Sequence, residues 1–345
     1  FLVAENLIVG RIAALLSVIF AVCLPLLVAT SMVKGFTFKW QQFSRNALII
    51  PVVCIAAFVA VKHTFQSISY QYEGYSKFIN RDFLYESIPT TYLEKPSASS
   101  ANVQPFKSVL DRVKQRGFLR VGYFRDDLPY SFHNSKGKLV GFDIEIMNQL
   151  AGDLGVGIEF VKIFRKEAGP LLASGYLDIT SGVPVIPDNM KEFLLSWPYS
   201  DQHVAFIVKD KRRAEFVDWE NIRDRKDLII GIPEKVFYKK AVKAYFTKGK
   251  AWEISTPRLF FKEEFKHIDA MLLGAPAASA WTLLNPSYTV VSPKPLLPAL
   301  TMAFPINKND QLFELYLRNW IKMKKRNKSL DRLFSYWIEG EKPAL

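Results

Sequence analysis

The chain has 345 residues, of which 49% are hydrophobic and 14% aromatic, enough for two lobes or domains with a sizeable core. Its net charge of +13 favours an anionic partner, which is a membrane surface, an acidic ligand or nucleic acid. The Lys and Arg are scattered and no zinc-ligand spacing or RNA-binding signature accompanies them, so nucleic acid is the weakest of the three. The two cysteines, Cys23 and Cys54, both lie in apolar runs, which argues against a disulfide.

Two uncharged stretches near the N-terminus predict membrane helices. Residues 12–32 carry no charge and are long enough to cross a bilayer, and Pro25 is tolerated within a membrane helix. A signal peptide is the alternative for this run, but no clear small-residue cleavage site follows it. The second uncharged run, 47–61, is shorter. The predicted helix over 47–62 fits either a second span or a buried core helix, and its position beside the first run favours the span.

The loop between these runs predicts the topology. Lys34, Lys39 and Arg45 lie in it without an accompanying acid, so the positive-inside rule places the loop in the cytoplasm. Residues 66–345 are then expected in the periplasm, tethered to a bacterial inner membrane. The same rule places Phe1 outside the cytoplasm, from which we expect further spans upstream of it.

Residues 66–105 are predicted to be an extracytoplasmic linker. Residues 87–104 are rich in Ser, Pro, Thr and Ala, which is typical of linkers. Nearer the membrane lies an aromatic group, Tyr70, Tyr72, Tyr75 and Phe78. This group fits a membrane interface and a small packed segment equally well.

Beyond the linker, short strands alternate with helices in two successive series, which predicts an α/β fold with mostly parallel sheets. Apolar runs at 203–209 and 297–304 are interpreted as strands that cross between two lobes. The predicted lobes are 106–208 with 303–340 for lobe 1, and 209–302 for lobe 2. Two crossing strands suggest a hinge, and hence a clamshell that closes on a ligand.

The stretch 117–150 carries a resemblance to a known family. It contains G-x-L-R-V-G from residue 117, L-P-Y-S-F from residue 128 and G-K-L-V-G-F-D-I-E-I from residue 137; further along the chain, G-Y-L-D-I-T-S-G starts at residue 175 and Pro198-Tyr199 follows. These motifs resemble the family 3 extracytoplasmic solute-binding proteins over roughly residues 106–340. The resemblance implies the type 2 periplasmic-binding fold, in which two α/β lobes close on a small molecule. A domain of this fold that follows the two N-terminal apolar runs is similar to binding domains fused to transporters.

Candidate ligand contacts follow from the predicted strands, because ligands of open α/β sheets lie beyond the carboxyl ends of the strands. In lobe 2, one of these ends is a strand-to-helix turn whose free N–H groups suit an anion. The candidates are Tyr123, Arg125, Asp126, Asp127, Tyr130 and Phe132 after the first strand, Ser181, Gly182 and Val183 after the third, Pro233, Glu234, Lys235, Val236 and Phe237 at the turn of lobe 2, and Gly274 with Ala275 after a later strand.

Several of these residues have an ordinary structural interpretation as well. Tyr130 and Phe132 fit core or hinge packing, and Lys235 fits a solvated lysine at a helix start. Asp143, in the Gly-Phe-Asp of the family motif, is interpreted as a structural hydrogen-bond acceptor rather than as a ligand contact.

The chain departs from the pattern that the resemblance implies for amino-acid binding. In such members an Arg after the third strand holds the ligand carboxylate, and an Asp in the second lobe holds the ammonium. These two positions fall on Asn189 and Gly274. A neutral residue cannot replace an ion pair in a desolvated cleft. The sequence therefore disfavours an α-amino acid and favours an organic anion or a ligand held by aromatic contacts, while a lobe pair that binds nothing stays open.

No constellation in the sequence points to catalysis. The four histidines are far apart, without metal-ligand spacing, and neither a nucleophile elbow nor a phosphate-binding loop is present. We therefore expect no enzymatic activity, cofactor or metal. The sequence predicts a tethered solute-binding domain for transport of a small organic anion or amino-acid-like solute, with membrane lipid and an attached or separate permease as partners. A ligand-sensing receptor is the alternative.

Overall fold

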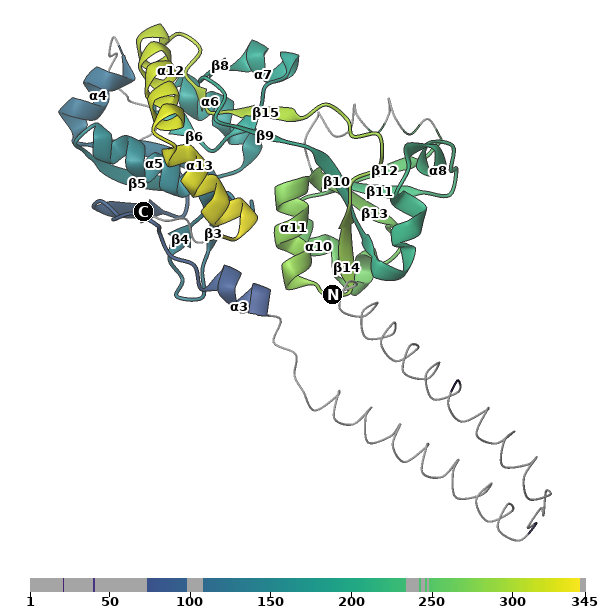
Figure 1. Ribbon diagram of the computed structural model, residues 1–345. Helices are drawn as coiled ribbons and strands as arrows, with labels where there is room; N and C mark the ends of the chain where they lie inside the picture. Colours follow the sequence, from purple (N-terminus) through teal and green to yellow (C-terminus); the bar gives the residue numbers. More distant parts are fainter. Residues whose placement is uncertain are drawn as a thin grey trace. The chain divides into compact units, whose positions relative to one another are not determined.

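The computed structural model describes residues 73–97, 108–233 and 248–341, with the single positions 21, 40, 242 and 246. By its internal contacts the chain divides into two compact units, Phe1–Tyr70 and Gln71–Leu345, and the three long described stretches belong to the second unit (Figure 1). The predicted membrane helices lie outside the described residues, except for Ala21. Within the described stretches, no helix is long and apolar enough to cross a membrane.

Lobe 1 is built around a six-stranded sheet with the strand order β1-β5-β2-β6-β16-β8. The first four strands in this order pair in parallel, whereas β16 runs antiparallel to both β6 and β8. Parallel neighbours need crossover connections, which is why strands and helices alternate in the sequence. The strands are β1 (Thr90–Leu93), β5 (Gly157–Ile163), β2 (Phe118–Phe124), β6 (Ile179–Thr180), β16 (Pro305–Ile306) and β8 (Leu194–Leu195).

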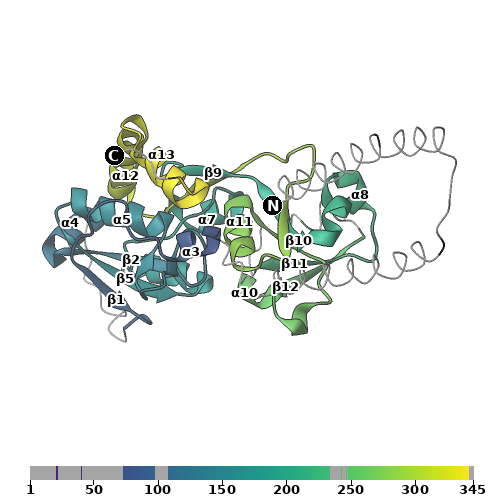
Figure 2. The same cartoon turned by 60° about the horizontal axis from the view of Figure 1, so that its bottom comes forward.

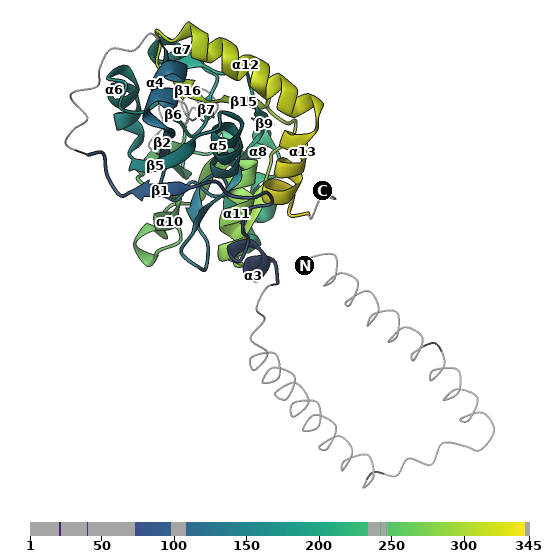
Figure 3. The ribbon, with the colours of Figure 1, turned by 90° about the vertical axis from the view of Figure 1, so that its left-hand side faces the viewer.

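Helices cover both faces of this sheet because side chains alternate along its strands. On β2, Val121 and Tyr123 belong to one buried cluster, which lies under four helices, and Phe124 belongs to a second cluster under α6. Figure 3 shows α12 and α13 running along lobe 1. The helices are α4 (Val109–Arg116), α5 (Phe142–Asp153), α12 (Gln311–Arg326) and α13 (Ser329–Phe334) over the first cluster, and α6 (Ala168–Ala173) over the second.

Asp310 joins two distant stretches of the chain within lobe 1. Its carboxylate accepts a hydrogen bond from Phe313 N at 2.9 Å and so caps α12. It also accepts hydrogen bonds from Ser108 Oγ at 3.0 Å and from Val109 N, at the start of α4. One carboxylate therefore satisfies the first turns of two helices that lie about two hundred residues apart.

The segment before the sheet belongs to lobe 1, which corrects the prediction that residues 66–105 are a linker throughout. In α3 (Glu73–Ile79), the buried ring of Phe78 stacks on Phe132 at 4.8 Å. Further along, β1 pairs with β5 and forms the edge of the sheet (Figure 2). Tyr75 is partly exposed, so only Phe78 of the predicted aromatic group is shown to pack. Residues 98–107 lie outside the described stretches.

Lobe 2 contains a five-stranded sheet with the order β12-β11-β13-β10-β14. β11 is parallel to β12 and β13, and β10 is antiparallel to β13 and β14. Short helices lie over the two faces of the sheet (Figure 1). The elements are β12 (Lys250–Ile254), β11 (Ile229–Pro233), β13 (Ala270–Gly274), β10 (Val204–Lys209), β14 (Tyr288–Val291), α8 (Trp219–Arg223), α10 (Pro257–Phe260) and α11 (Ala275–Leu284).

Two strands of a small third sheet join the lobes. Its order is β7-β15-β9, with β7 (Val183–Pro184), β15 (Leu300–Ala303) and β9 (Ser200–Gln202). The chain passes from β9 into β10 and later returns through β15 (Figure 1). We therefore call β9 and β15 the hinge strands and their sheet the hinge sheet. The predicted crossing strand 203–209 is thus placed wrongly: β10 lies entirely within the sheet of lobe 2, which begins near His203 and not at 209. A buried central strand and a crossing strand are equally apolar, so the sequence pattern did not separate them.

Candidate ligand-binding site

A cavity of about 780 Å³ lies between the two lobes, within the size range of small-molecule sites. It opens at the carboxyl ends of β2, β5, β11, β12 and β13, as expected for an open α/β sheet. The hinge strands contribute to its lining as well. Its main polar and aromatic lining residues are Arg125, Asp126, Asp127, Tyr130, Asp143, Phe164, Arg165, Lys166, Gly182, Tyr199, Gln202, Thr256, Arg258, Gly274 and Trp281.

Seven of the predicted ligand contacts line this cavity, namely Arg125, Asp126, Asp127, Tyr130, Gly182, Pro233 and Gly274. They come from both lobes and from four strand ends, so the structure brings together residues that the sequence placed apart. Asp143 lines the cavity too. Lys235, Val236, Phe237 and Glu234 lie outside the described residues.

Other predicted contacts lie elsewhere. The buried ring of Tyr123 packs edge-on against Phe160 at 6.3 Å, on the helix-covered face of the sheet. Phe132 packs between Phe78 and Trp337, so its packing interpretation is correct. Side chains alternate between the two faces of a strand. Tyr123 and Phe132 both point to the side that packs in the core and not into the cavity.

The three remaining candidates of lobe 1 do not line the cavity either. Ser181 is buried, and Val183 pairs with Ala303 in the hinge sheet. Asn189 lies in α7 (Pro187–Glu192), where its Nδ2 donates to Pro184 O at 2.7 Å. At this position, where the resemblance implies a carboxylate-binding Arg, the chain has a local backbone contact instead.

Gln202 fills the space beside Gly274, where the resemblance implies an acid. A Cβ added to Gly274 would overlap Gln202 Oε1. The same oxygen accepts a hydrogen bond from Tyr130 OH at 2.8 Å, and Gln202 Nε2 lies 2.8 Å from Met302 Sδ. A neutral amide from the hinge strand thus takes the place of a charged anchor and connects lobe 1 to both hinge strands.

Asp143 sits at the start of α5 and links it to the hinge. Its two carboxylate oxygens accept hydrogen bonds from Gly182 N at 2.9 Å and from Tyr199 OH at 2.8 Å. Tyr199 in turn stacks on Phe304 at 4.0 Å. Burial raises the pKa of Asp143 to about 7, against the opposing effect of the two hydrogen bonds. Asp143 therefore has the structural role that its position suggested, although it also borders the cavity.

We expect Asp143→Asn to become less destabilising, relative to the native chain, as the pH rises from about 4 to about 7. The pKa of Asp143 is about 7 in the folded chain, but about 3.9 in an unfolded one. The folded state therefore favours the protonated form. The stability this contributes is complete below the unfolded pKa and is lost as the pH rises through the folded pKa, at up to about 1.4 kcal/mol per pH unit.

Urea unfolding of both chains at about pH 5 and about pH 8 measures this difference. The pKa of Glu145 is also raised to about 7, first by burial, but Glu145 titrates in both chains and cancels. Between the two pH values the native chain should lose more stability than D143N. Equal losses would show that Asp143 is already ionised at the lower pH.

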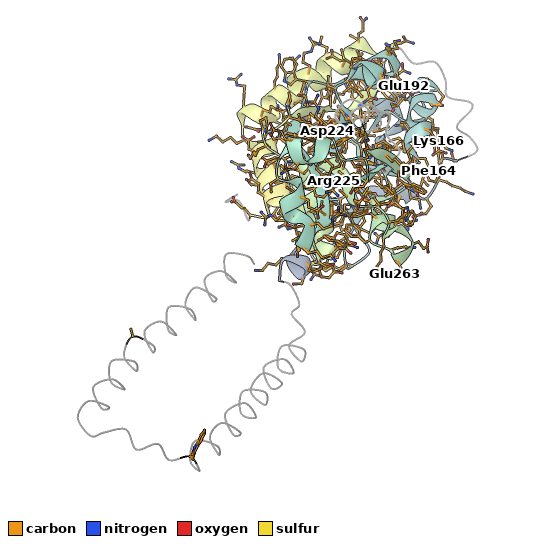
Figure 4. All side chains as sticks on the ribbon, turned by 90° about the vertical axis from the view of Figure 1, so that its right-hand side faces the viewer. Phe164, Lys166, Glu192, Asp224, Arg225 and Glu263 are labelled. Atoms are coloured by element: carbon orange, nitrogen blue, oxygen red, sulfur yellow. The ribbon has the colours of Figure 1, made fainter. Side chains whose placement is uncertain are left out.

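Ion pairs surround the mouth of the cavity. Within lobe 1, Arg165 Nη2 lies 2.9 Å from Asp127 Oδ2, and the guanidinium lies over the ring of Phe124 at 4.0 Å. Between the lobes, Arg258 Nη2 lies 2.7 Å from Asp126 Oδ1. The sequence did not predict either arginine as a ligand contact. Each lies beyond the end of a strand, and the fold of the intervening loop brings it to the cavity. Figure 4 marks Phe164 and Lys166, which line the cavity from lobe 1, and the Phe164 side chain is 71% exposed.

A second cavity, of about 430 Å³, lies on lobe 1. It is lined only by the segment before the sheet and by α5, α12 and α13, including Tyr85, Asn148 and Arg332. Since no residue of lobe 2 reaches it, closure of the lobes cannot enclose a ligand there. The cavity between the lobes is therefore the candidate site. In the described stretches no group of His, Cys, Asp and Glu is arranged to hold a metal ion.

Comparison with known proteins identifies the family. The family model of the bacterial extracellular solute-binding proteins, family 3, matches residues 119–340, which include both lobes and the hinge. The chain belongs to this family. The predicted two-lobed α/β periplasmic-binding-protein fold is thereby confirmed, as is the predicted resemblance.

Relatives within this family differ in their named roles. Cyclohexadienyl dehydratase of Pseudomonas aeruginosa is 24% identical over 248 residues, which are 71% of this chain and 92% of the relative. A probable amino-acid ABC transporter-binding protein of Haemophilus influenzae is 27% identical over 119 residues, 34% of this chain and 46% of that protein. A crystal structure of an ancestral amino acid-binding protein, described as a precursor of cyclohexadienyl dehydratase, is 28% identical with a TM-score of 0.61, and covers 67% of this chain and 100% of that chain. Because one relative is named as an enzyme, family membership alone does not separate binding from catalysis.

Proposed function

We propose that this family member is a membrane-tethered, extracytoplasmic solute-binding domain that captures a small organic anion for transport. The observation that carries the proposal is the 780 Å³ cavity lined from both lobes and from the hinge. A ligand in this cavity contacts both lobes at once and therefore binds the closed arrangement better than an open one. Such differential binding converts ligand capture into closure.

The charges of the cavity favour an anion over an ammonium ligand. Cationic side chains outnumber acidic ones in its lining, and three of the acids are already paired with a lining cation. The cations are Lys95, Arg125, Lys162, Arg165, Lys166 and Arg258, and the acids are Glu94, Asp126, Asp127, Asp143 and Glu167. Gln202 offers only a neutral amide beside Gly274, so this position has no carboxylate for an ammonium group. Asp143 is mostly protonated below its raised pKa of about 7, and both of its oxygens already accept hydrogen bonds from Gly182 and Tyr199. The named amino-acid binders among the relatives make an amino acid the competing ligand class, which the test below includes.

The proposed tether and partners rest on the sequence. The uncharged runs 12–32 and 47–61, with the basic loop between them, support two membrane helices that place the binding domain in the periplasm. In this arrangement lipid surrounds the helices, and an attached or separate permease receives the solute and supplies the driving force. A ligand-sensing receptor uses the same closure, with a signal in place of transport as its output.

Catalysis is a second candidate, because one observation favours it. Asp143 is a cavity-lining carboxyl with a raised pKa, as general acids often are, and a relative is named a dehydratase. However, both oxygens of Asp143 already accept hydrogen bonds from Gly182 and Tyr199. Binding is therefore the better-supported function, since these two hydrogen bonds already give Asp143 a structural role.

Addition of a dicarboxylate is expected to raise the melting temperature of the full chain in detergent, because ligand binding stabilises the native state by mass action. The panel runs from malonate to adipate, with glutamine and arginine as amino-acid probes. Stabilisation by the amino acids alone would contradict the proposed anion. The absence of any shift would indicate a lobe pair that binds nothing from either class.

Tyr130→Phe tests the site itself. Tyr130 is buried in the core, so Tyr130→Ala would disturb folding, whereas Phe keeps the ring and loses only the hydroxyl that holds Gln202. Loss of this hydrogen bond is expected to weaken ligand binding by roughly threefold to tenfold. An unchanged thermal shift in Y130F would show that the hydrogen bond between Tyr130 and Gln202 does not contribute to ligand binding.

A further inference from the structure

Among the residues that the structure describes, one ion pair spans the mouth of the cavity from lobe 2 to lobe 1. Arg258 lies in the first turn of α10, where Thr256 caps the helix by accepting from Arg258 N at 3.3 Å. Its guanidinium faces Asp126 as a fork, with Nη2 2.7 Å from Oδ1 and Nε 3.4 Å from Oδ2. Both residues line the cavity. The pair therefore occupies space that a ligand entering the cleft would share.

Arg258 is positioned as a receptor for a carboxylate. Its guanidinium lies 5.3 Å from the centre of the Trp281 ring, which is almost fully buried and stacks in turn on Phe261 at 5.9 Å. The aromatic surface supports the cation from below and restricts its rotamers. A planar guanidinium held in this way presents two parallel N–H donors, which match the two oxygens of a carboxylate.

Asp126 keeps a cationic neighbour when Arg258 is taken by another anion. Arg125 Nε lies 3.7 Å from Asp126 Oδ2, on the same lobe. The Arg125 side chain is 71% exposed, so it is free to follow Asp126 as the lobes move. Exchange of one carboxylate for another at Arg258 thus leaves no buried charge without a partner, which is the main cost of breaking an ion pair.

The ion pairs that line the cavity within lobe 1 differ in this respect, and one of them joins Lys162 to Glu94. Arg165 and Asp127 both belong to lobe 1, and Arg165 also covers the Phe124 ring. Neither of these two pairs changes when the lobes move apart, so closure does not depend on their exchange. Of the ion pairs described in the cavity lining, the bridge between Arg258 and Asp126 is the one that couples an anion-binding group to the separation of the lobes.

We propose that Arg258 is the residue that holds the carboxylate of the ligand, and that Asp126 takes the place of this carboxylate in the empty cleft. Ligand binding is then an exchange at one guanidinium: the Asp126 carboxylate leaves towards Arg125, and the ligand carboxylate enters. This inference rests on the proposed function, and it adds a residue and an internal competitor to it. The ligand must then carry at least one carboxylate. Only an anion can replace Asp126 at the guanidinium and so gain binding free energy there.

The two partners should respond in opposite directions when glutarate is titrated into the full chain. Arg258→Gln removes the receptor and is expected to weaken binding by about tenfold to a hundredfold. Asp126→Asn removes the competitor and is expected to tighten binding severalfold, by up to about tenfold. Asn is also suited to the left-handed backbone of residue 126, with its φ of 57°, so the turn is retained.

Two controls complete the experiment. Arg225→Gln removes an arginine of an exposed ion pair outside the cavity and should leave the affinity unchanged. Glutaramide, the uncharged diamide of glutarate, should bind R258Q and the native chain alike. Weaker glutarate binding by D126N would overturn the competitor role, and unchanged binding by R258Q would overturn the receptor role. If no dicarboxylate binds even the native chain, the proposed anion function fails as well; if the native chain and R258Q bind equally, this inference alone fails.

Discussion

A chain that begins at residue 100 is expected to be less stable than one that begins at Gln71 by at least about 5 kcal/mol, from lost apolar burial and lost backbone hydrogen bonds together. The segment 73–97 lies at the surface of lobe 1 but contributes to its core. It supplies Phe78, which is only 3% exposed, and the edge strand β1. Its removal leaves the edge of β5 unpaired and the ring of Phe132 without its stacking partner.

The same segment satisfies a buried carboxylate and the C-terminus of the domain. Glu145 Oε1 accepts a hydrogen bond from Tyr85 N at 2.8 Å, and its Oε2 accepts from Trp337 Nε1 at 2.6 Å. Arg81 donates to Tyr336 O, and its guanidinium lies over the Tyr336 ring at 5.2 Å. The loss of the segment therefore leaves a buried acceptor unpaired, in addition to the lost apolar contacts.

Urea unfolding of the two shortened chains measures this difference. The chain from Gln71 serves as the reference because it contains the complete second unit. The shorter chain should show a lower transition midpoint or be unfolded without denaturant. Equal midpoints would mean that the segment only rests on lobe 1.

The second large effect is expected for Asp178→Ala, which should destabilise the chain by about 3–5 kcal/mol. Asp178 is fully buried, and its carboxylate accepts from Arg112 Nε at 2.9 Å, from Arg120 N at 2.7 Å and from Arg116. Removal of the carboxylate leaves two arginines of α4 without their buried partner. An unpaired buried charge costs more than the pair itself contributes.

Asp227→Ala is the matched control for this substitution. Asp227 also pairs with an arginine, Arg225, at 2.6 Å, but its side chain is 68% exposed. Solvent screens such a pair, so its loss should cost much less than the loss of Asp178. Denaturation of the two variants side by side separates burial from ion pairing. A cost for D178A as small as that for D227A would contradict the buried role of Asp178.

The fold was readily predicted because its signals are local. The apolar run of β2 and the helix that follows residue 141 stand in the sequence as strand and helix, and the family motifs lie on them. The edge strand β1 was missed because only its partner strand makes it recognisable. Its residues Thr90 to Leu93 are half-exposed and are followed by a stretch of Pro, Ser and Ala, which alone indicates a linker.

The site was predicted only where position along a strand decides it. The rule that ligands lie beyond strand ends found Arg125, Tyr130 and Gly274. It also selected Tyr123, but the alternation of side chains along the strand places the ring of Tyr123 in the core. A missing acid at Gly274 is visible in the sequence, whereas the amide of Gln202 that fills the space comes from the hinge, seventy residues earlier. Such contacts depend on how strands from different sheets meet, which no local pattern encodes.

Arg258 was missed for the same reason. Nothing in its neighbours along the chain distinguishes it from the other arginines of a basic protein. Its significance comes from Trp281 beneath it and from Asp126 opposite, which belong to another helix and another lobe. The proposed anion preference therefore rests on Arg258 as well as on the two missing anchors.

Calorimetric titration of the full chain with glutarate and with glutaramide tests the central claim most directly. The two compounds share a carbon skeleton of the same length and differ in charge, so the ratio of their affinities reports the charge preference of the cleft. The account predicts that glutarate binds at least about tenfold more tightly, as expected for a charge-assisted contact with an arginine. Tighter binding of glutaramide, or of an amino acid with no measurable binding of glutarate, would contradict it.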